Sequence, residues 1–313
     1  MGRLALGGAA LFLPVGGGSV QAPSGSGGEG YPRPGPLEPS GPVPGPLRLL
    51  FVHHSCGGRL LADPGEPEDG EHCIHGVHPD GGGLRRLLVA RGYEVHEASY
   101  GSELGEHTDL FDWLPKFRDR MDRILTCDRQ DASYRDGGRN RIVVFKSCFP
   151  NNAFVAEGFE PGNPAGPELT VANARAVLRA LLEPFSRRPD TLFVYVTAPP
   201  LAPAVPDVPA WKWIAATILG RSPAGRLRES ARLAREFHRW AVAPDGWLAG
   251  YPGRNVVVFD LYDVLTDRGA SDLSAFPTGN GADSHPSREG NRRAAEAFVP
   301  FLDRAVRQAG LVP

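Results

Sequence analysis

The sequence lacks a surplus of either charge: among its 313 residues, 34 Lys and Arg stand against 36 Asp and Glu, a formal net charge of −2. Proteins that track nucleic-acid phosphates usually carry a basic excess, so no nucleic-acid partner is expected. The sequence also lacks any apolar run near the ~18 residues that a membrane-spanning helix needs, so no membrane span is expected. Hydrophobic residues still make up 41% of the chain, which is enough to bury a sizeable core.

Cysteine is scarce and forms no recognisable pattern. The four cysteines, Cys56, Cys73, Cys127 and Cys148, make neither a CxxC pair nor a dense disulfide framework. Three disulfide connectivities remain open, and so does the alternative of buried free thiols. The cysteines therefore do not indicate a compartment.

Glycine and proline, in contrast, are concentrated at the start of the chain. They supply 22 of the first 46 residues. Residues 1–22 combine one Arg, a modestly apolar stretch and small residues suited to signal peptidase, which favours an exported leader, with a cytoplasmic location as the alternative. Residues 23–46 are predicted to be a Pro/Gly-rich linker without fixed structure, which leaves residues 47–313 as the folded domain.

Short apolar, β-branched runs alternate with segments of helical period through this domain, a pattern typical of βα units around a mostly parallel five-stranded sheet. The predicted strands are Leu47–Val52, Glu94–Ser99, Arg141–Ser147, Thr191–Thr197 and Asn255–Leu261. The predicted helices are Gly83–Arg91, Asp109–Cys127, Thr170–Arg187, Gly225–Val242 and Arg288–Gln308. The fold class is thus α/β, a three-layer doubly wound sandwich with its ligand crevice at the carboxyl ends of the strands.

Polar residues suited to catalysis follow these strands. Ser55 comes after the first strand in His53-His54-Ser55-Cys56-Gly57-Gly58, and Gly101 comes after the second. Asn151 and Asn152 follow the third strand, and Asp283-Ser284-His285 precedes the last helix. The constellation is an ordered set of Ser, Gly, Asn and Asp/His.

This set resembles the four sequence blocks of the SGNH/GDSL hydrolase superfamily, serine esterases and lipases on a flavodoxin-like sheet. The resemblance covers residues 47–313 and implies no metal or cofactor. Carried over residue by residue, it implies the following roles: Ser55 as nucleophile and backbone oxyanion donor, His285 as general base, Asp283 as its orienting carboxylate, and Gly101 and Asn151 as further oxyanion donors, with Asn152 as the alternative to Asn151.

Two departures from the family pattern stand out. The usual Gly-Asp-Ser of the first block is His53-His54-Ser55 here, and the sequence assigns no catalytic step to either histidine. The acid and base are separated by Ser284 alone, where the family usually has two residues between them. In an extended segment, residues two apart project to the same side, so contact between Asp283 and His285 remains feasible.

The resemblance implies a serine hydrolase that cleaves O-acyl esters, with acetyl groups on a saccharide as one candidate substrate and a lipase or thioesterase as alternatives. Two segments are candidates for the walls of the substrate pocket, the insert Pro199–Trp213 and the loop Asp267–Asp283. Their aromatic side chains, Trp211, Trp213 and Phe276, would pack against the substrate. The sequence does not indicate an oligomeric state.

Four other interpretations compete with a serine esterase. A catalytically silent carbohydrate- or ligand-binding domain remains open because fold does not establish activity. Zinc ligands are present in a short loop, His72, Cys73, His75 and His78, but their spacing matches no common zinc finger. An α/β-hydrolase elbow would need Gly where His53 stands, and no nucleotide-binding glycine motif follows any strand.

Overall fold

The computed structural model describes residues 47–67, 72–204 and 222–312. The predicted leader 1–22, the linker 23–46, and the two tryptophans Trp211 and Trp213 lie outside these residues.

A central sheet organises the described chain. It contains seven strands in the order β6-β5-β4-β1-β7-β8-β9. Every neighbouring pair is parallel except β5 and β6. The strands are β1 (Leu47–Val52), β4 (Tyr93–Ala98), β5 (Cys127–Arg129), β6 (Ala132–Ser133), β7 (Ile142–Lys146), β8 (Leu192–Val196) and β9 (Val256–Phe259).

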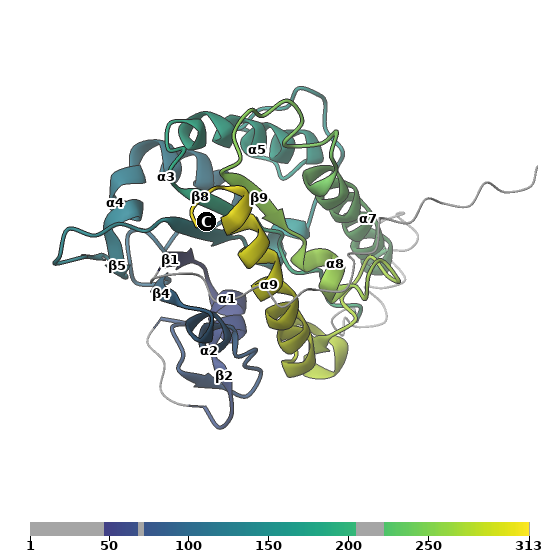
Figure 1. Cartoon of the computed structure of the whole chain (residues 1–313). Helices are drawn as coiled ribbons and strands as arrows, with labels where there is room; N and C mark the ends of the chain where they lie inside the picture. Colours follow the sequence, from purple (N-terminus) through teal and green to yellow (C-terminus); the bar gives the residue numbers. More distant parts are fainter. Residues whose placement is uncertain (1–46, 68–71, 205–221, 313) are drawn as a thin grey trace, which may run out of the picture. The chain divides into compact units, whose positions relative to one another are not determined.

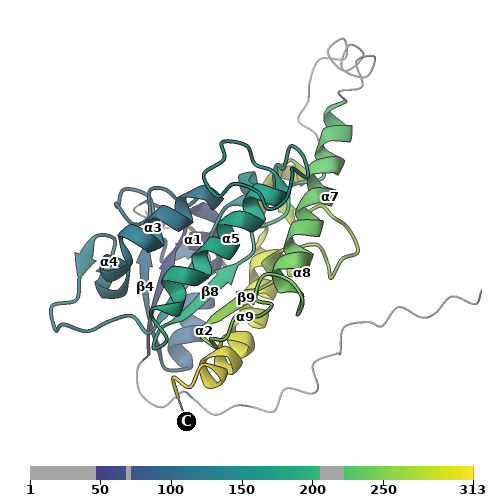
Figure 2. The ribbon, with the colours of Figure 1, turned by 90° about the horizontal axis from the view of Figure 1, so that it is seen from above.

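Helices cover both faces of this sheet, which confirms the doubly wound α/β prediction (Figures 1 and 2). The three long helices are α5 (Val171–Ser186), α7 (Pro223–Val242) and α9 (Arg288–Gln308). The shorter helices are α1 (Ser55–Leu61), α2 (Leu84–Ala90), α3 (Trp113–Asp119), α4 (Met121–Thr126) and α8 (Leu261–Leu265), and the 3-10 turns are η1 (Leu110–Asp112), η2 (Phe149–Asn152) and η3 (Gly279–Gly281). Two small two-stranded sheets lie outside the main sheet. One pairs β2 (Asp63–Pro64) with β3 (Val77–His78), and the other pairs β10 (Pro277–Thr278) with β11 (Asp283–Pro286).

The alternation of side chains along β1 explains the two layers of helices. Leu50 and Val52 point into one core, together with buried side chains of α3, α5 and α7. Leu49 and Phe51 point into the other, together with α1, α2 and α9. Figure 1 shows α3 and α5 on one side of the sheet and α1, α2 and α9 on the other. Strands buried on both faces need continuous apolar runs, and β1, β7 and β8 have them.

The prediction of five strands is wrong, because β5 and β6 extend the sheet beyond β4. They have three residues and two residues, so neither produces a recognisable apolar run. The predicted helix Asp109–Cys127 is also divided, since Arg120 leaves helical geometry (φ −126, ψ 14) between α3 and α4, and Cys127 belongs to β5.

Strand order determines where a ligand would bind. From β1 the chain moves to β4 on one side, and it later enters the sheet again as β7 on the other side. The order of connections therefore reverses at β1, and in such sheets the carboxyl ends of the strands at the reversal form the binding crevice. The segments after β1, β4 and β7 are those that contain Ser55, Gly101 and Asn151.

Candidate active site

Ser55 is the first residue of α1, and two residues, His53 and His54, separate it from the end of β1. The carbonyl of His54 accepts hydrogen bonds from the N–H groups of Gly57 (2.9 Å) and Gly58 (3.1 Å), which closes a tight turn. A Cβ at Gly58 would lie 1.9 Å from the carbonyl oxygen of Cys73, so only glycine fits there. The turn leaves Ser55 half-buried at the crevice.

The structure brings Ser55, His285 and Asp283 into one hydrogen-bonded row. Ser55 Oγ lies 2.8 Å from His285 Nε2, and His285 Nδ1 lies 2.7 Å from Asp283 Oδ1. An ionised carboxylate only accepts hydrogen bonds, so Nδ1 carries the proton and Nε2 has the free lone pair. In this arrangement the imidazole can take the proton of the serine hydroxyl as that oxygen attacks an electrophile.

Asp283 and His285 can contact each other with only Ser284 between them because all three residues belong to the extended strand β11. Asp283 and His285 project to one side, and Ser284 projects away and accepts a 2.8 Å hydrogen bond from Ala202 N–H. This contact places the described beginning of the Pro199–Trp213 insert beside the acid and the base.

Asp283 is held in its ionised form by its surroundings. Burial pushes its pKa upward, but hydrogen bonds from the backbone and ring of His285 and from Thr278 Oγ1 (2.9 Å) hold the pKa below its usual value. The Asp283 side chain is still 42% exposed, so solvent weakens each of these interactions. Thr278 is a site residue that the sequence analysis missed, because only the pairing of β10 with β11 brings it to Asp283.

The predicted oxyanion donors have other partners in this structure. The Gly101 N–H donates to Glu106 Oε2 at 2.9 Å. The Asn151 amide donates to Asp109 Oδ1 at 2.8 Å, and its Oδ1 accepts from Leu110 N–H at 2.7 Å. Both residues lie in the loops that follow the strands beside β1, but the structure does not present their donors free of protein acceptors.

Asn152 is more deeply buried than Asn151, and its side chain also has hydrogen-bond partners within the protein. Its amide donates to the carbonyls of Ala198 (3.1 Å) and Pro199 (2.7 Å), and its Oδ1 lies 2.8 Å from His238 Nε2. The residue is fully buried. Asn152 thus ties the loop after β7 to the end of β8 and to α7, and both of its amide hydrogens are used in doing so.

The two histidines before Ser55 have different surroundings. His54 is half-buried and stacks on Tyr100 with ring centroids 3.7 Å apart, and burial lowers its pKa. His53 is fully buried, and its Nε2 lies 3.0 Å from Glu97 Oε2. His53 therefore anchors the turn from inside, and His54 lies at the crevice.

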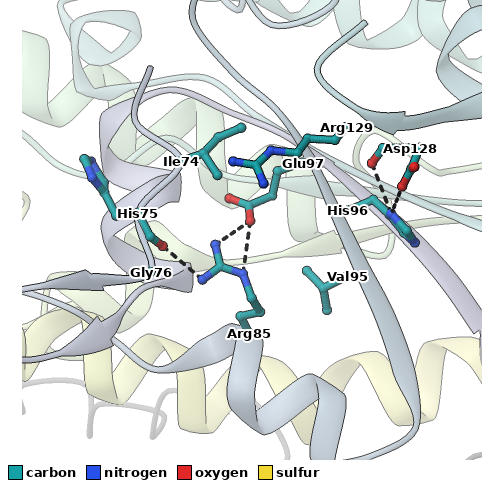
Figure 3. A pocket seen from close by; sticks show the side chains of 9 residues that line it. All are labelled: Ile74, His75, Gly76, Arg85, Val95, His96, Glu97, Asp128 and Arg129. Carbon is teal, nitrogen blue, oxygen red and sulfur yellow. Dashed lines mark hydrogen bonds and ion pairs between the residues drawn. The ribbon is translucent and has the colours of Figure 1, made fainter. Parts of the chain in front are cut away.

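Glu97 also faces a separate polar cavity of about 350 Å³. In this cavity Arg85 donates to Glu97 Oε1 (3.1 Å) and to the carbonyl of His75 (3.0 Å), as Figure 3 shows. Burial opposes ionisation of Glu97, yet hydrogen bonding and charge from His53, followed by the charge of Arg85, hold its pKa below the usual value. The network connects the turn before Ser55 to the segment 72–78.

The aromatic candidates for pocket walls and the candidate metal ligands do not belong to the row Ser55–His285–Asp283. Phe276 is partly buried and packs against the core beside α9, with the guanidinium of Arg293 over its ring. Phe149 is closer to the site, since its ring packs edge-on against His285 with centroids 5.0 Å apart. Among residues 47–67, 72–204 and 222–312, no group of three or more His, Cys, Asp or Glu side chains is arranged to hold a metal ion.

Comparison with known proteins gives structural similarity only. No family model matches the chain, and no curated protein matches it. The chain is similar to Axe2, an acetylxylan esterase from Geobacillus stearothermophilus, with 12% identity and a TM-score of 0.39 over 84% of this chain and 94% of that one. It is also similar to a carbohydrate esterase family 2 enzyme with a carbohydrate-binding domain from Corynascus thermopiles (Myceliophthora fergusii), with 13% identity and a TM-score of 0.37 over 87% and 69%.

A third similar structure is a "putative GDSL-like lipase" from Parabacteroides merdae, with 13% identity and a TM-score of 0.36 over 86% of this chain and 98% of that one. At these identities and TM-scores the similarity assigns no activity to this chain, and the functional argument rests on the side chains of the site.

Proposed function

We propose that this protein is a serine hydrolase of the SGNH type that cleaves O-acyl esters through an acyl-enzyme. The observation that carries the proposal is the row Ser55–His285–Asp283, with contacts of 2.8 Å and 2.7 Å. A serine hydroxyl is a weak nucleophile near neutral pH, so it needs a base within hydrogen-bond reach, which His285 supplies.

In the proposed reaction, Ser55 Oγ attacks the ester carbonyl carbon and its proton passes to His285 Nε2. Asp283 keeps Nδ1 protonated and stabilises the imidazolium that forms. His285 then gives the proton to the leaving alcohol, and a water molecule, deprotonated by His285 in the same way, releases the acid from Ser55. The backbone N–H of Ser55 is the proposed first oxyanion donor. Gly101 and Asn151 join it once substrate displaces Glu106 and Asp109.

Two side chains lie close to the nucleophile and its base. Cys148 Sγ lies 3.8 Å from Ser55 Oγ, and Phe149 packs against His285. Esters of small acyl groups such as acetyl are therefore the proposed substrates, and a saccharide as their alcohol part stays an expectation from the sequence resemblance. In the described part of the chain no helix has the length and apolarity to cross a membrane. Export through the leader 1–22 and the absence of nucleic-acid binding stay predictions.

The experiment compares p-nitrophenyl acetate with longer acyl esters, using the wild type, Ser55→Ala, and Ser186→Ala as an exposed-serine control. We expect Ser55→Ala to lower kcat by at least ~10³-fold, since triad members act as a unit. Ser186→Ala should match the wild type. A fluorophosphonate probe should label the Ser55 peptide. Equal rates in the wild type and Ser55→Ala would contradict the serine mechanism, and a preference for long chains would indicate a lipase or thioesterase.

The competing function is a catalytically silent ligand-binding domain. One observation favours this function: the Gly101 N–H and the Asn151 amide both donate to carboxylates, so neither is free to donate to an oxyanion. Absence of both hydrolysis and fluorophosphonate labelling, together with retained binding of an acetylated saccharide, would favour that function.

A further inference from the structure

Lys146, at the end of β7, is a fully buried cation beside the candidate site. Its Nζ donates to the carbonyl of Ser147 at 3.1 Å and lies 3.7 Å from Cys148 Sγ. In the described part of the chain, no carboxylate lies within ion-pair distance of this ammonium group. A buried charge without a counter-charge is costly, so the sulfur of Cys148 is the group suited to balance it.

Cys148 lies beside the beginning of α1. Its Sγ lies 3.8 Å from Ser55 Oγ, and the thiol and backbone N–H of Cys56 lie close enough to this sulfur to interact with it. The Cys56 thiol, followed by the charge of Lys146, lowers the pKa of Cys148 well below its usual value, although burial opposes this. The interaction with Cys148, followed by burial, raises the pKa of Cys56 well above its usual value.

The other two cysteines have no such surroundings. Cys127 is buried, its Sγ donates to the carbonyl of Gln130, and burial raises its pKa to about 12. Burial also raises the pKa of Cys73. All four cysteines are free thiols in the structure. Thiolates, not thiols, react with oxidants, so the geometry singles out Cys148.

We propose that Cys148 is an oxidation site for hydroperoxides, with Cys56 as the resolving thiol. Cys148 is 9% exposed and lies at the crevice next to Ser55, where a small peroxide can reach it. The inference concerns sulfur chemistry and depends on the proposed esterase function only for its effect on activity.

The chemistry balances with the peroxide as the oxidant. The Cys148 thiolate attacks one peroxide oxygen and the O–O bond breaks, which gives the sulfenic acid Cys148–SOH and hydroxide or alkoxide. The Cys56 thiol then attacks this sulfur, forming the Cys56–Cys148 disulfide and releasing water. Two electrons pass from the sulfur pair to the peroxide. A thiol reductant reverses the product.

The disulfide would act on the nucleophile because Cys56 directly follows Ser55. An S–S bond is about 2 Å long, much shorter than a non-bonded sulfur contact, so its formation draws the first turn of α1 toward the loop after β7. Displacement of a reacting group by about 1 Å can cost ~10²-fold in rate. We therefore expect oxidation to lower esterase activity by at least ~10-fold.

The experiment treats the full-length protein with stoichiometric hydrogen peroxide and follows intact mass, free thiols and p-nitrophenyl acetate hydrolysis. We expect the loss of two thiols and about two mass units, a peptide joining Cys56 to Cys148, and recovery with dithiothreitol. Cys56→Ser should stop at the sulfenic acid, trapped as a dimedone adduct on Cys148. Cys127→Ser, the matched buried-cysteine control, should behave like the wild type. Cys148→Ser should lose neither thiols nor its own initial activity.

Two results would overturn the proposal: wild type that keeps all its thiols at peroxide concentrations that oxidise free cysteine, or Cys148→Ser that forms a disulfide at the wild-type rate. If Cys148→Ser does not fold, alkylation of the wild type by iodoacetamide at pH 6 replaces it. Preferential modification of Cys148 supports the proposal, and equal modification of all four cysteines contradicts it. The mass and thiol counts stay readable even if the protein has no esterase activity.

Discussion

Ser55 Oγ and His285 Nε2 lie 2.8 Å apart although 230 positions separate the two residues in the chain. Ser55 is carried by the turn after β1, and His285 by β11 directly before α9, which packs against α1. The contact therefore depends on the packing of two elements on one face of the sheet. Its value for catalysis depends in turn on the side chains that surround each of the two residues.

Asp283→Asn should lower kcat by ~10²–10⁴-fold with little change in KM, because the amide no longer holds the ring tautomer that leaves Nε2 free. Because the Asp283 side chain is partly exposed and solvent weakens its interactions, we expect a decrease in kcat near the lower end of this range. Steady-state kinetics with p-nitrophenyl acetate measures it. Thr278→Val, which removes one hydrogen bond to Asp283, should cost less than Asp283→Asn; the reverse order would mean that the carboxylate does not orient His285.

Asn151→Ala and Asn152→Ala should separate catalysis from stability. Asn152→Ala leaves two buried carbonyls and His238 without a partner, so we expect it to lower the unfolding free energy by about 2–4 kcal/mol. If Asn151 donates to the oxyanion, Asn151→Ala should lower kcat by ~10²-fold or more while keeping a higher melting temperature than Asn152→Ala. Denaturant titrations and kinetics on both variants test this, and an unchanged kcat in Asn151→Ala removes that residue from the proposed mechanism.

Gly101→Ala should destabilise the protein through two additive causes. Gly101 has φ +76, a conformation that costs an L residue about 1–2 kcal/mol, and the new Cβ would lie 2.7 Å from the ring of His72. In a His72→Ala background, Gly101→Ala should no longer lose unfolding free energy through the clash with the His72 ring. The loss that comes from the positive φ should remain. A double-mutant cycle on unfolding free energy measures the difference, and an equal cost in both backgrounds would show that the loop around His72 adjusts freely.

His238 should make the protein lose stability in mild acid. Burial, followed by the charge of Arg235, lowers its pKa to about 3, well below the value of 6.5 for an unfolded histidine. Between these two pH values the unfolded chain binds a proton that the native state does not, so the unfolding free energy falls as the pH drops from about 6.5 toward about 3. The loss should be on the order of a few kcal/mol.

His238→Gln offers the matched control, since its amide can donate to Asn152 and does not titrate. Denaturant titrations at pH 7 and pH 4.5 should show a smaller acid loss in His238→Gln than in the wild type. Parallel curves for the two proteins would mean that other groups cause the acid sensitivity.

Local sequence determined the frame of this fold. The predicted strand Leu47–Val52 and the predicted helix Arg288–Gln308 have the bounds that the structure shows. The strand has a nearly continuous apolar run, and the helix has a periodic apolar pattern that begins after Ser287. Thr170 likewise caps α5 by accepting from Asn173 N–H, an interaction between residues close in sequence. The order of Ser, Gly, Asn and Asp/His at the strand ends could also be read directly, since parallel strands place those ends along one edge.

Tertiary structure alone decided the partners of polar groups that lie far apart in the chain. Nothing in the sequence around Asn151 indicates that Asp109, 42 positions earlier, accepts its amide, or that Lys146 and Cys56 both face Cys148. Likewise, the edge strands β5 and β6 are too short for a local pattern and exist because β4 offers them an open edge. Hydrogen-bond partners and thiol protonation depend on distances of a few ångströms between segments that only packing brings together, whereas strand and helix positions follow from the periodicity of neighbouring residues.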